Sequence, residues 1–234
     1  MLYNKVEKRQ EWLDCAILGG EFLKKYGHNG NYNWYFSLDR SGRPLVEPYN
    51  IFSYTFATMA FGQLSLATGS QEYADIAKKT FDIILSKVDN PKGKWNKLHP
   101  GTRNLKNFAL PMILCNLALE IEHLLEPGYL EQTMETCIHE VMEVFYRPEL
   151  GGIIVENVDM DGNLVNCFEG RQVTPGHAIE SCSALLRIPL GFDRLRIRNY
   201  HALWLNFPEH STHRFSCHNV VLQPHICRNI GGLG

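Results

Sequence analysis

The sequence predicts an all-α fold in which inner and outer helices form part of a ring, or toroid, with β-hairpins in the connections. Two observations support this fold class. Helical segments that are apolar on every side alternate with segments that are apolar on one side only, which is the pattern of buried and surface helices. Short extended runs around Gly-containing turns lie between the helices and are typical of hairpins. About five or six helices are predicted, fewer than a closed double ring requires, so we expect a partial toroid.

The first two predicted elements are a helix over residues 9–25 and a hairpin over residues 32–47. In the helix, apolar residues recur at helical spacing. Gly19 and Gly20 lower its helix propensity, so we expect the helix to pack closely against a neighbour there. In the hairpin, two extended runs flank the turn sequence 39–42.

Further helices follow in an alternating order. Residues 51–68 contain no charged residue, which predicts a buried helix. Residues 71–88 carry their charges along one side, which predicts a surface helix. Residues 108–125 are again mostly apolar and residues 129–145 are again amphipathic, so the same inner and outer order repeats.

A second hairpin is predicted around the Asp-Gly turn at residues 159–162, with residues 152–155 and 164–165 as its two strands. The hairpins and the long loop at residues 90–104 belong to the connections between helices. In a toroid of this kind such connections gather at one end, where they surround a cleft.

The segment after the second hairpin carries the clearest chemical signal. Pro175 suits the first turn of a helix, in which His177 and Glu180 stand three residues apart and share one face. A histidine held by a carboxylate moves protons near neutral pH, so His177 is a candidate general base and Glu180 its orienting acid. The alternatives are a histidine that packs at a helix start and a glutamate on an exposed surface.

The composition argues against several classes of function. The net charge is −2 and the isoelectric point is about 6.5, so the chain has no electrostatic footprint for nucleic acid. No apolar run is long enough to span a bilayer, and the charged N-terminus lacks the apolar core of a signal peptide. Seven cysteines without paired spacing predict reduced thiols in a cytoplasmic protein.

Residues 182–234 differ in composition from the rest of the chain. They contain six arginines, no lysine and two acidic residues, a net charge of +4 that leaves −6 for residues 1–181. We expect a barrel domain over residues 1–181 and a separate tail, whose composition favours translation in a shifted reading frame over a basic interaction arm. Histidines and cysteines between His210 and Cys227 are of metal-ligand type, but their spacing fits no compact zinc module, so no metal site is predicted.

Between residues 2 and 180 the sequence resembles the N-acylglucosamine 2-epimerase family, also known for renin-binding protein. Seven segments carry the resemblance together and in order: Gly19-Gly20-Glu21-Phe22-Leu23, Leu38–Pro44, Ile51-Phe52-Ser53, Asn90–Lys94, Pro100–Arg103, Glu156-Asn157-Val158 and Glu169–Glu180. The resemblance implies an (α/α)6 barrel. It also implies a reaction that interconverts N-acetylglucosamine and N-acetylmannosamine by proton transfer at C2 of the open-chain sugar.

The resemblance further implies roles for individual residues. His177 matches the first of two catalytic histidines of the family, and Glu180 matches the acid that accompanies it. Arg171 and Glu169 are expected to bind substrate in the cleft. The family's arginine and second histidine have no match here, so the chain is expected to be truncated at both ends relative to the family. Two functions stay open: an active epimerase, and a non-catalytic remnant or binding module of the same fold.

The resemblance also implies the partners of the protein. The expected small-molecule partner is an amino sugar, the expected assembly is a homodimer, and ATP is an expected allosteric effector, with no catalytic cofactor.

The loop at residues 92–97 is a candidate phosphate contact, although it lacks a Walker pattern, and the alternative is a solvated basic loop. Tyr49 and Phe52 are candidates to stack on a sugar ring, against the alternative of core packing. Glu156 and Glu169 are a candidate glycosidase pair, against the alternative of solvated hairpin carboxylates.

Overall fold

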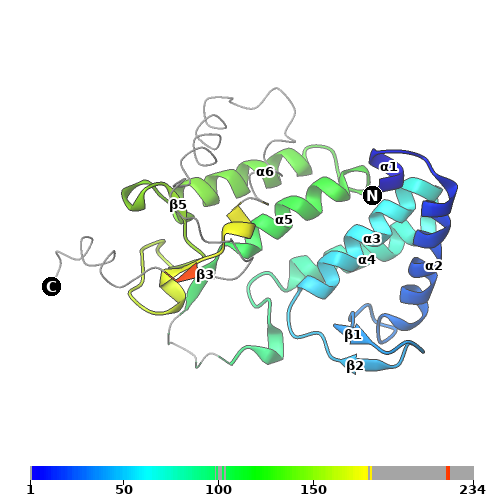
Figure 1. The fold of residues 1–234 in the computed structure, drawn as a ribbon, viewed down its shortest axis with the longest axis horizontal. Helices are drawn as coiled ribbons and strands as arrows, with labels where there is room; N and C mark the ends of the chain where they lie inside the picture. Colours follow the sequence, from blue (N-terminus) through cyan, green and yellow to red (C-terminus); the bar gives the residue numbers. More distant parts are fainter. Residues whose placement is uncertain are drawn as a thin grey trace, which may run out of the picture. The chain divides into compact units, whose positions relative to one another are not determined.

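The computed structural model describes residues 2–97, 99, 102, 104–178, 180, 220 and 221. Contacts between residues divide the chain into two units, which are described separately. Unit 1 consists of Met1–Lys97 with Leu117–Pro127, and unit 2 of Leu98–Asn116 with Gly128–Gly234. Helices make up most of the described chain, and the strands form sheets of only two strands each (Figure 1). This confirms the predicted all-α class with hairpins in the connections.

Unit 1 contains a pair of long helices, the helix that precedes them and a hairpin. Its elements are α1 (Leu2–Lys5), α2 (Gln10–Tyr26), β1 (Ser37–Leu38), β2 (Pro44–Val46), α3 (Phe52–Thr68), α4 (Gln71–Ser86), η1 (Gly93–Trp95) and η2 (Glu122–Leu124). Strands β1 and β2 pair antiparallel, as predicted for residues 32–47. The carboxylate of Asp39 closes the hairpin turn, because Oδ1 accepts hydrogen bonds from the main-chain N–H groups of Ser41 and Arg43, both at 2.9 Å.

Helices α3 and α4 lie side by side and show how the apolar pattern is used (Figure 1). Helix α4 buries one face and leaves its charged face in solvent, as predicted. Thr80 of α4 is fully buried, and its hydroxyl accepts a hydrogen bond from the indole N–H of the buried Trp34 at 3.0 Å. Helix α3 buries most of its residues, but Phe56 is 62% exposed and Leu66 is 51% exposed. The prediction that α3 is buried on every side is therefore wrong on one side.

Gly20 explains the glycine pair in α2. A Cβ at Gly20 would stand 2.5 Å from Cδ1 of Leu64, so a larger residue here would require the end of the Leu64 side chain to shift. Close packing at this position is confirmed. A Cβ at Gly19 would meet no atom within 4 Å. Gly19 instead forms part of the wall of a groove.

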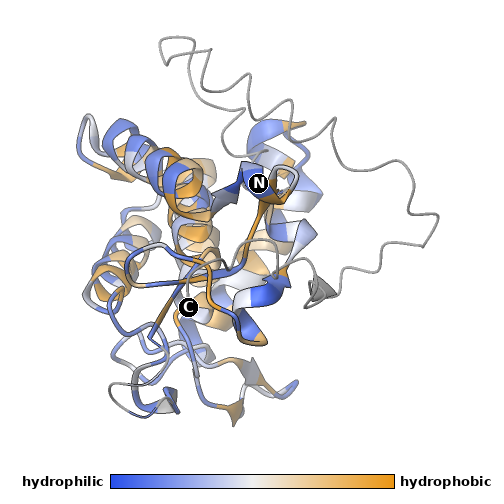
Figure 2. Ribbon diagram, turned by 90° about the vertical axis from the view of Figure 1, so that its left-hand side faces the viewer, coloured by the Kyte–Doolittle hydropathy of each residue, from blue (hydrophilic) through white to orange (hydrophobic). Residues whose placement is uncertain are grey.

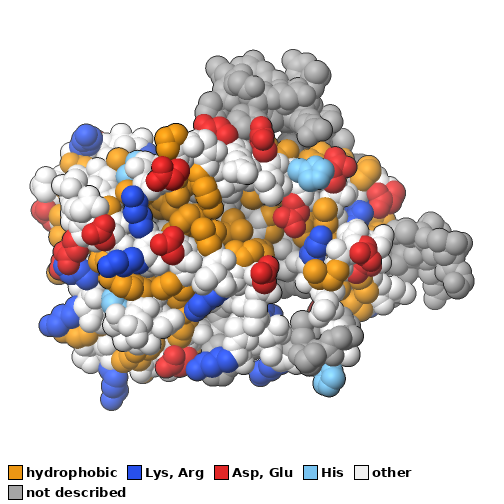
Figure 3. Space-filling model, turned by 180° about the vertical axis from the view of Figure 1, so that it is seen from behind, with side chains coloured by type: hydrophobic (Ala, Val, Ile, Leu, Met, Phe, Trp, Pro, Cys, Tyr) orange, Lys and Arg blue, Asp and Glu red, His pale blue; other side chains and the backbone are white. Residues whose placement is uncertain are grey.

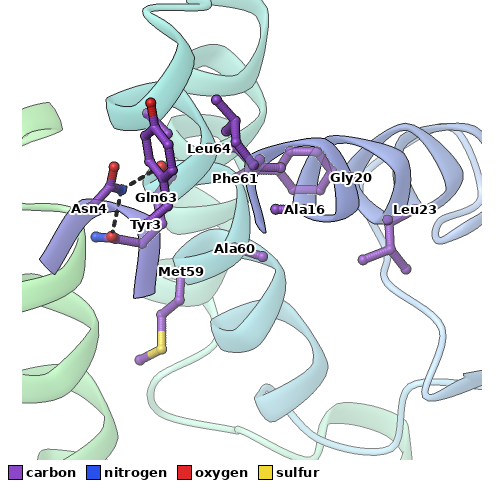
Figure 4. A pocket seen from close by; sticks show the side chains of 13 residues that line it. Tyr3, Asn4, Ala16, Gly20, Leu23, Met59, Ala60, Phe61, Gln63 and Leu64 are labelled. Atoms are coloured by element: carbon purple, nitrogen blue, oxygen red, sulfur yellow. Dashed lines mark hydrogen bonds between the residues drawn. The ribbon is translucent and has the colours of Figure 1, made fainter. Parts of the chain in front are cut away.

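That groove lies between α1, α2 and α3 and has a volume of about 350 Å³ (Figure 4). Its lining is mostly apolar and comes largely from α2 and α3. At the α1 side, Nδ2 of Asn4 donates hydrogen bonds to the main-chain oxygen and to Oε1 of Gln63, both at 3.0 Å (Figure 4). Such a lining suits contact with another hydrophobic surface and supplies no acid–base pair for catalysis.

Unit 2 combines two helices with several short strands and turns. Its elements are β3 (Leu105–Asn107), the start of α5 (Ala109–Glu120), α6 (Tyr129–Glu140), the π-helical turn η3 (Val141–Phe145), β4 (Tyr146–Arg147), η4 (Pro148–Leu150), β5 (Ile153–Ile154), β6 (Asn157–Asp159), η5 (Glu169–Arg171), β7 (Gln172–Val173) and β8 (Val220–Val221). The four residues Leu117–Glu120 of α5 belong to unit 1. Helix α5 ends at Glu120, earlier than the predicted helix over residues 108–125, and the 3-10 turn η2 follows it.

The second predicted hairpin is wrong in its pairing. The turn at residues 159–162 forms, because Oδ1 of Asp159 accepts a hydrogen bond from the N–H of Asn163 at 2.7 Å. Residues 164–165, predicted as its second strand, form no strand. Strand β6 pairs with β3, which lies 52 residues earlier by the Lys106–Val158 register, and β5 pairs with β4. The local turn signal is correct, but a strand distant in the sequence takes the hydrogen bonds.

The distribution of hydrophobic side chains agrees with this architecture. In Figure 2 most helices carry a hydrophobic side and a hydrophilic side. Figure 3 shows that hydrophobic side chains also gather on one face of the surface. In unit 1 the exposed set includes Leu18, Phe56 and Leu66. Among the described residues, none of the helices combines the length and hydrophobicity that a membrane span requires.

Candidate functional site

The site in unit 2 is built around Glu156, which stands between β5 and β6. The main chain of Glu156 is held on both sides: its N–H donates to the carbonyl oxygen of Gln172, and its carbonyl accepts from the N–H of Phe108, both at 2.9 Å. The side chain is 6% exposed. The sequence thus places a carboxylate at a fixed and buried position, where it needs a partner to offset the loss of hydration.

His177 supplies that partner. Its Nδ1 lies 3.1 Å from both carboxylate oxygens of Glu156. Because Nδ1 faces a carboxylate, it carries the hydrogen, which both oxygens share. Residues 175–178 are helical, with Pro175 in the first turn as predicted. The His177 side chain is 35% exposed, and Nε2 makes no hydrogen bond with any residue in the described part of the chain.

The carboxylate changes the acid–base behaviour of the imidazole. The hydrogen bond to Glu156 raises the pKa of His177 above its ordinary value of 6.5, and this outweighs the lowering effect of partial burial. The charges of Glu156 and Glu180 add to the rise. The neutral form, which is the one that accepts a proton at Nε2, therefore appears at a higher pH than in a free histidine.

Glu180 does not occupy the place that its spacing suggested. It is exposed, and Oε1 accepts a hydrogen bond from Nδ2 of Asn116 on α5 at 3.0 Å. Its effect on His177 is that of a nearby charge only. The acid that orients the imidazole is Glu156, which is 21 residues earlier in the chain. The prediction that Glu180 orients His177 is wrong in this respect, while its catalytic assignment stays a prediction.

Arg171 and Glu169 lie in η5, the turn that leads to His177. Gly170 between them is buried, and a Cβ there would overlap the carbonyl oxygen of Val165, so this turn requires glycine. Nη1 of Arg171 donates to Oδ1 of Asn166 at 2.7 Å. The main-chain oxygen of Glu169 accepts from Nδ2 of Asn157, next to Glu156, at 2.9 Å. The structure thus brings the turn of the two predicted substrate-binding residues to β6, and their role stays a prediction.

The carboxylate of Glu156 is occupied by His177, which does not favour a glycosidase mechanism with Glu169. Such a mechanism needs two carboxylates that both face the scissile bond. A sequence signal for the observed pairing existed in the segment Glu156-Asn157-Val158, which carried part of the family resemblance. Local spacing could not show that this segment reaches His177.

A second, polar cavity of about 490 Å³ lies in unit 1. It is lined by Asn29, Asn33, Glu47, Pro48, Asn50, Tyr54, Ser86, Lys87, Asn90, Pro91, Lys92, Gly93 and Lys94. Nζ of Lys87 donates to the hydroxyl of Tyr54 at 2.9 Å, and that hydroxyl donates to Oδ1 of Asn33 at 3.1 Å. The loop at residues 92–97, the candidate phosphate contact, thus contributes lysines to the lining of this cavity.

The remaining candidates are the aromatic residues predicted to stack on a sugar and the histidine and cysteine cluster of the tail. Tyr49 is 41% exposed and packs against the ring of Phe36 at a centroid distance of 4.8 Å, whereas Phe52 is half-buried at the start of α3. The cluster between His210 and Cys227 lies outside the described residues. Within the described part, no three histidine, cysteine, aspartate or glutamate side chains come together as a metal site requires.

Comparison with known proteins places the chain in a family. The family model for N-acylglucosamine 2-epimerase (GlcNAc 2-epimerase) matches residues 1–213. The chain belongs to the N-acylglucosamine 2-epimerase family. The resemblance given by the sequence motifs is therefore confirmed. The matched range extends beyond residue 180, while the separate tail and its shifted reading frame stay predictions.

Relatives in this family are mammalian N-acylglucosamine 2-epimerases. The Bos taurus protein is 31% identical over 226 residues, which cover 89% of this chain and 53% of that protein. The Homo sapiens protein is 32% identical over 193 residues, which cover 80% of this chain and 45% of that protein. The chain spans about half the length of these curated relatives.

Solved structures agree on the fold. Cellobiose 2-epimerase from Bacillus thermoamylovorans aligns with a TM-score of 0.70 at 16% identity over 88% of this chain and 56% of that one. A D-mannose isomerase aligns with a TM-score of 0.63 at 12% identity over 85% of this chain and 52% of that one. The cellobiose 2-epimerases have an (α/α)6 barrel, which confirms the predicted fold class for members of this family.

Proposed function

We propose that His177 is a proton-transfer base of a sugar 2-epimerase, acting on the pair N-acetylglucosamine and N-acetylmannosamine. One observation carries the proposal: Nδ1 of His177 is bound to a buried carboxylate, while Nε2 makes no hydrogen bond within the described residues. An imidazole oriented in this way presents a lone pair at Nε2 when it is neutral. Membership of the family supports the choice of reaction.

The chemistry follows from the substrate. In the open-chain sugar the C2–H bond is weakened by the neighbouring aldehyde. Nε2 of His177 takes the C2 proton, and the electron pair of the C–H bond moves toward the carbonyl oxygen to give an enolate. The imidazolium that forms is stabilised by Glu156 through the hydrogen bond at Nδ1. Return of the proton to the same face regenerates the substrate, whereas inversion needs a second donor on the opposite face.

Proton exchange with solvent tests this proposal directly. We expect the purified protein, incubated with N-acetylmannosamine in deuterated water, to replace the C2 hydrogen with deuterium, as followed by proton NMR. The His177→Asn variant is the matched control and should lose the exchange. Deuterium at C2 together with the 2-epimer would indicate a complete site, and deuterium without the epimer would indicate one working base. No exchange by a folded wild-type protein would refute the proposal and favour the non-catalytic remnant.

The substrate choice has competitors. Structural neighbours are named for cellobiose 2-epimerisation and D-mannose isomerisation, and both reactions also move a hydrogen next to a sugar carbonyl. We propose the N-acylated amino sugar because the relatives with about 31% identity are N-acylglucosamine 2-epimerases. Exchange assays with cellobiose and D-mannose under the same conditions would contradict this choice if either sugar reacted faster.

We also propose ATP as an effector that binds in the polar cavity of unit 1. Lysines at 87, 92 and 94 in its lining supply positive charge that suits phosphate oxygens. Isothermal titration with ATP should show binding that is lost in a Lys92→Ala/Lys94→Ala variant. Binding that is unchanged in this variant would place ATP elsewhere.

We also propose a cellular compartment and an oligomeric state for the protein. A reducing, cytoplasmic compartment fits the four described cysteines, which are all free thiols. A homodimer is proposed from the family resemblance. Sedimentation velocity measurements would test it, and a monomer at micromolar concentration would refute it.

A further inference from the structure

Asn107, the last residue of β3, connects the site to its surroundings. Its Nδ2 lies 2.9 Å from Oδ1 of Asn157, 3.3 Å from Oε1 of Glu156 and 3.3 Å from the main-chain oxygen of Glu156. Its Oδ1 accepts a hydrogen bond from the N–H of Ala109 at 3.0 Å, at the start of α5. One side chain therefore joins β3, β6 and the first turn of α5 to the carboxylate that holds His177.

The contacts determine which way the amide of Asn107 points. Nδ2 faces three oxygen acceptors and Oδ1 faces an N–H donor. The reverse orientation would place Oδ1 against a carboxylate and Nδ2 against a donor, which would lose every one of these bonds. Nδ2 has two hydrogens for three acceptors. One hydrogen is donated to Oδ1 of Asn157, which makes the shorter contact. The other is shared between Oε1 and the main-chain oxygen of Glu156.

We propose that Asn107 is a positioning residue, which holds the carboxylate of Glu156 in line with Nδ1 of His177. The inference rests on the proposed function, because the position of Glu156 matters to catalysis only if His177 moves a proton. Asn157 supports the arrangement, since its Nδ2 is fixed by the main-chain oxygen of Glu169 at 2.9 Å. Without Asn107, one oxygen of Glu156 loses a donor and the side chain gains freedom to turn away from the imidazole.

The variant Asn107→Ser separates this role from the role of Asn107 at the start of α5. A serine hydroxyl can still accept from the N–H of Ala109, as in other Ser turns, but it does not reach the carboxylate. The measurement is the pKa of His177 by NMR titration of the histidine ring carbons, with the signal assigned from its loss in His177→Asn. Among the described residues, the charged groups that act on His177 are Glu156 and Glu180.

We expect the pKa of His177 to fall in Asn107→Ser, toward its ordinary value. The exposed residue Asn104, three positions earlier, provides the control: Asn104→Ser should leave the titration unchanged. In a Glu156→Gln background, Asn107→Ser should cause no further fall, because its effect passes through Glu156. Asn107→Thr, which also offers a turn-forming hydroxyl, serves as the second variant if the serine variant does not fold.

A pKa of His177 that stays at the wild-type value or rises in Asn107→Ser would overturn the inference. An equal fall with and without Glu156 would also overturn it, since Asn107 would then act by another route. The titration needs no substrate, so its outcome is separate from that of the exchange assay. Loss of C2 exchange with an intact Asn107 effect would refute the proposed function and leave the positioning of Glu156 established.

Discussion

Replacing the two members of the His177–Glu156 pair one at a time should destabilise the protein unequally. The Glu156 side chain is 6% exposed and that of His177 is 35% exposed. In His177→Ala the buried carboxylate loses its main partner and keeps the contact with Asn107 at 3.3 Å. An unsatisfied buried group costs about 1–3 kcal/mol, and more when it is charged. Because the vacated space is partly open to water, we expect a loss of about 2 kcal/mol in the free energy of unfolding.

Glu156→Gln should cost less. The glutamine oxygen still accepts from Nδ1 of His177, so a neutral hydrogen bond replaces a charge-assisted one, at a cost of about 1 kcal/mol. The imidazole left with this weaker partner is partly exposed and can be hydrated. The double variant His177→Ala/Glu156→Gln should be more stable than His177→Ala alone, because it removes the unpaired buried charge.

Urea unfolding followed by far-UV circular dichroism measures these differences. The pKa of His177 is raised in the folded protein, so the charged pair contributes its full stabilisation below the ordinary value of 6.5. That contribution is lost as the pH rises through the raised folded value. The stability gap between wild type and Glu156→Gln should therefore be larger at low pH than at high pH. Equal losses for the two single variants, or a gap that does not change with pH, would refute this account of the pair.

Three further changes test the site and its scaffold. His177→Asn should lower the rate of C2 deuterium exchange by about 100-fold or more, measured by NMR, because it removes the general base. Thr80→Val should lower the free energy of unfolding by about 1–3 kcal/mol in urea titrations, since it leaves the buried indole N–H of Trp34 without its acceptor. Gly170→Ala should cost about 1–3 kcal/mol by thermal unfolding, because its Cβ would overlap the carbonyl of Val165, whereas Gly19→Ala meets no atom within 4 Å and should cost nothing.

The helices could be predicted because their signal is local. Residues 51–68 and 71–88 show the apolar patterns of an inner and an outer helix, and the structure places α3 and α4 there within a few residues. The exposed side of α3 could not be predicted in the same way. A hydrophobic pattern shows that a helix can be buried, but it does not show which neighbours are present to cover each side.

The predictions of the second hairpin and of the acid that orients His177 were wrong for a common reason. The turn at residues 159–162 and the spacing of His177 and Glu180 are both local signals; the turn forms as predicted, whereas Glu180 bonds to Asn116 and not to His177. The partners that the structure selects are distant in the sequence: β3 for β6, and Glu156 for His177. Contacts of this kind depend on the tertiary fold, which brings distant segments together and cannot be predicted from the spacing of residues in one segment.

The burial and backbone support of Glu156 explain why the distant acid holds the histidine. Glu156 has both of its main-chain groups bonded to other segments, to Gln172 and to Phe108, and its side chain has little access to water. Glu180 is exposed and can exchange its bond with Asn116 for bonds with water at little cost. A base that must meet a C–H bond in one geometry requires an orienting acid that does not move. The buried acid meets this requirement, and the exposed acid one turn along the helix does not.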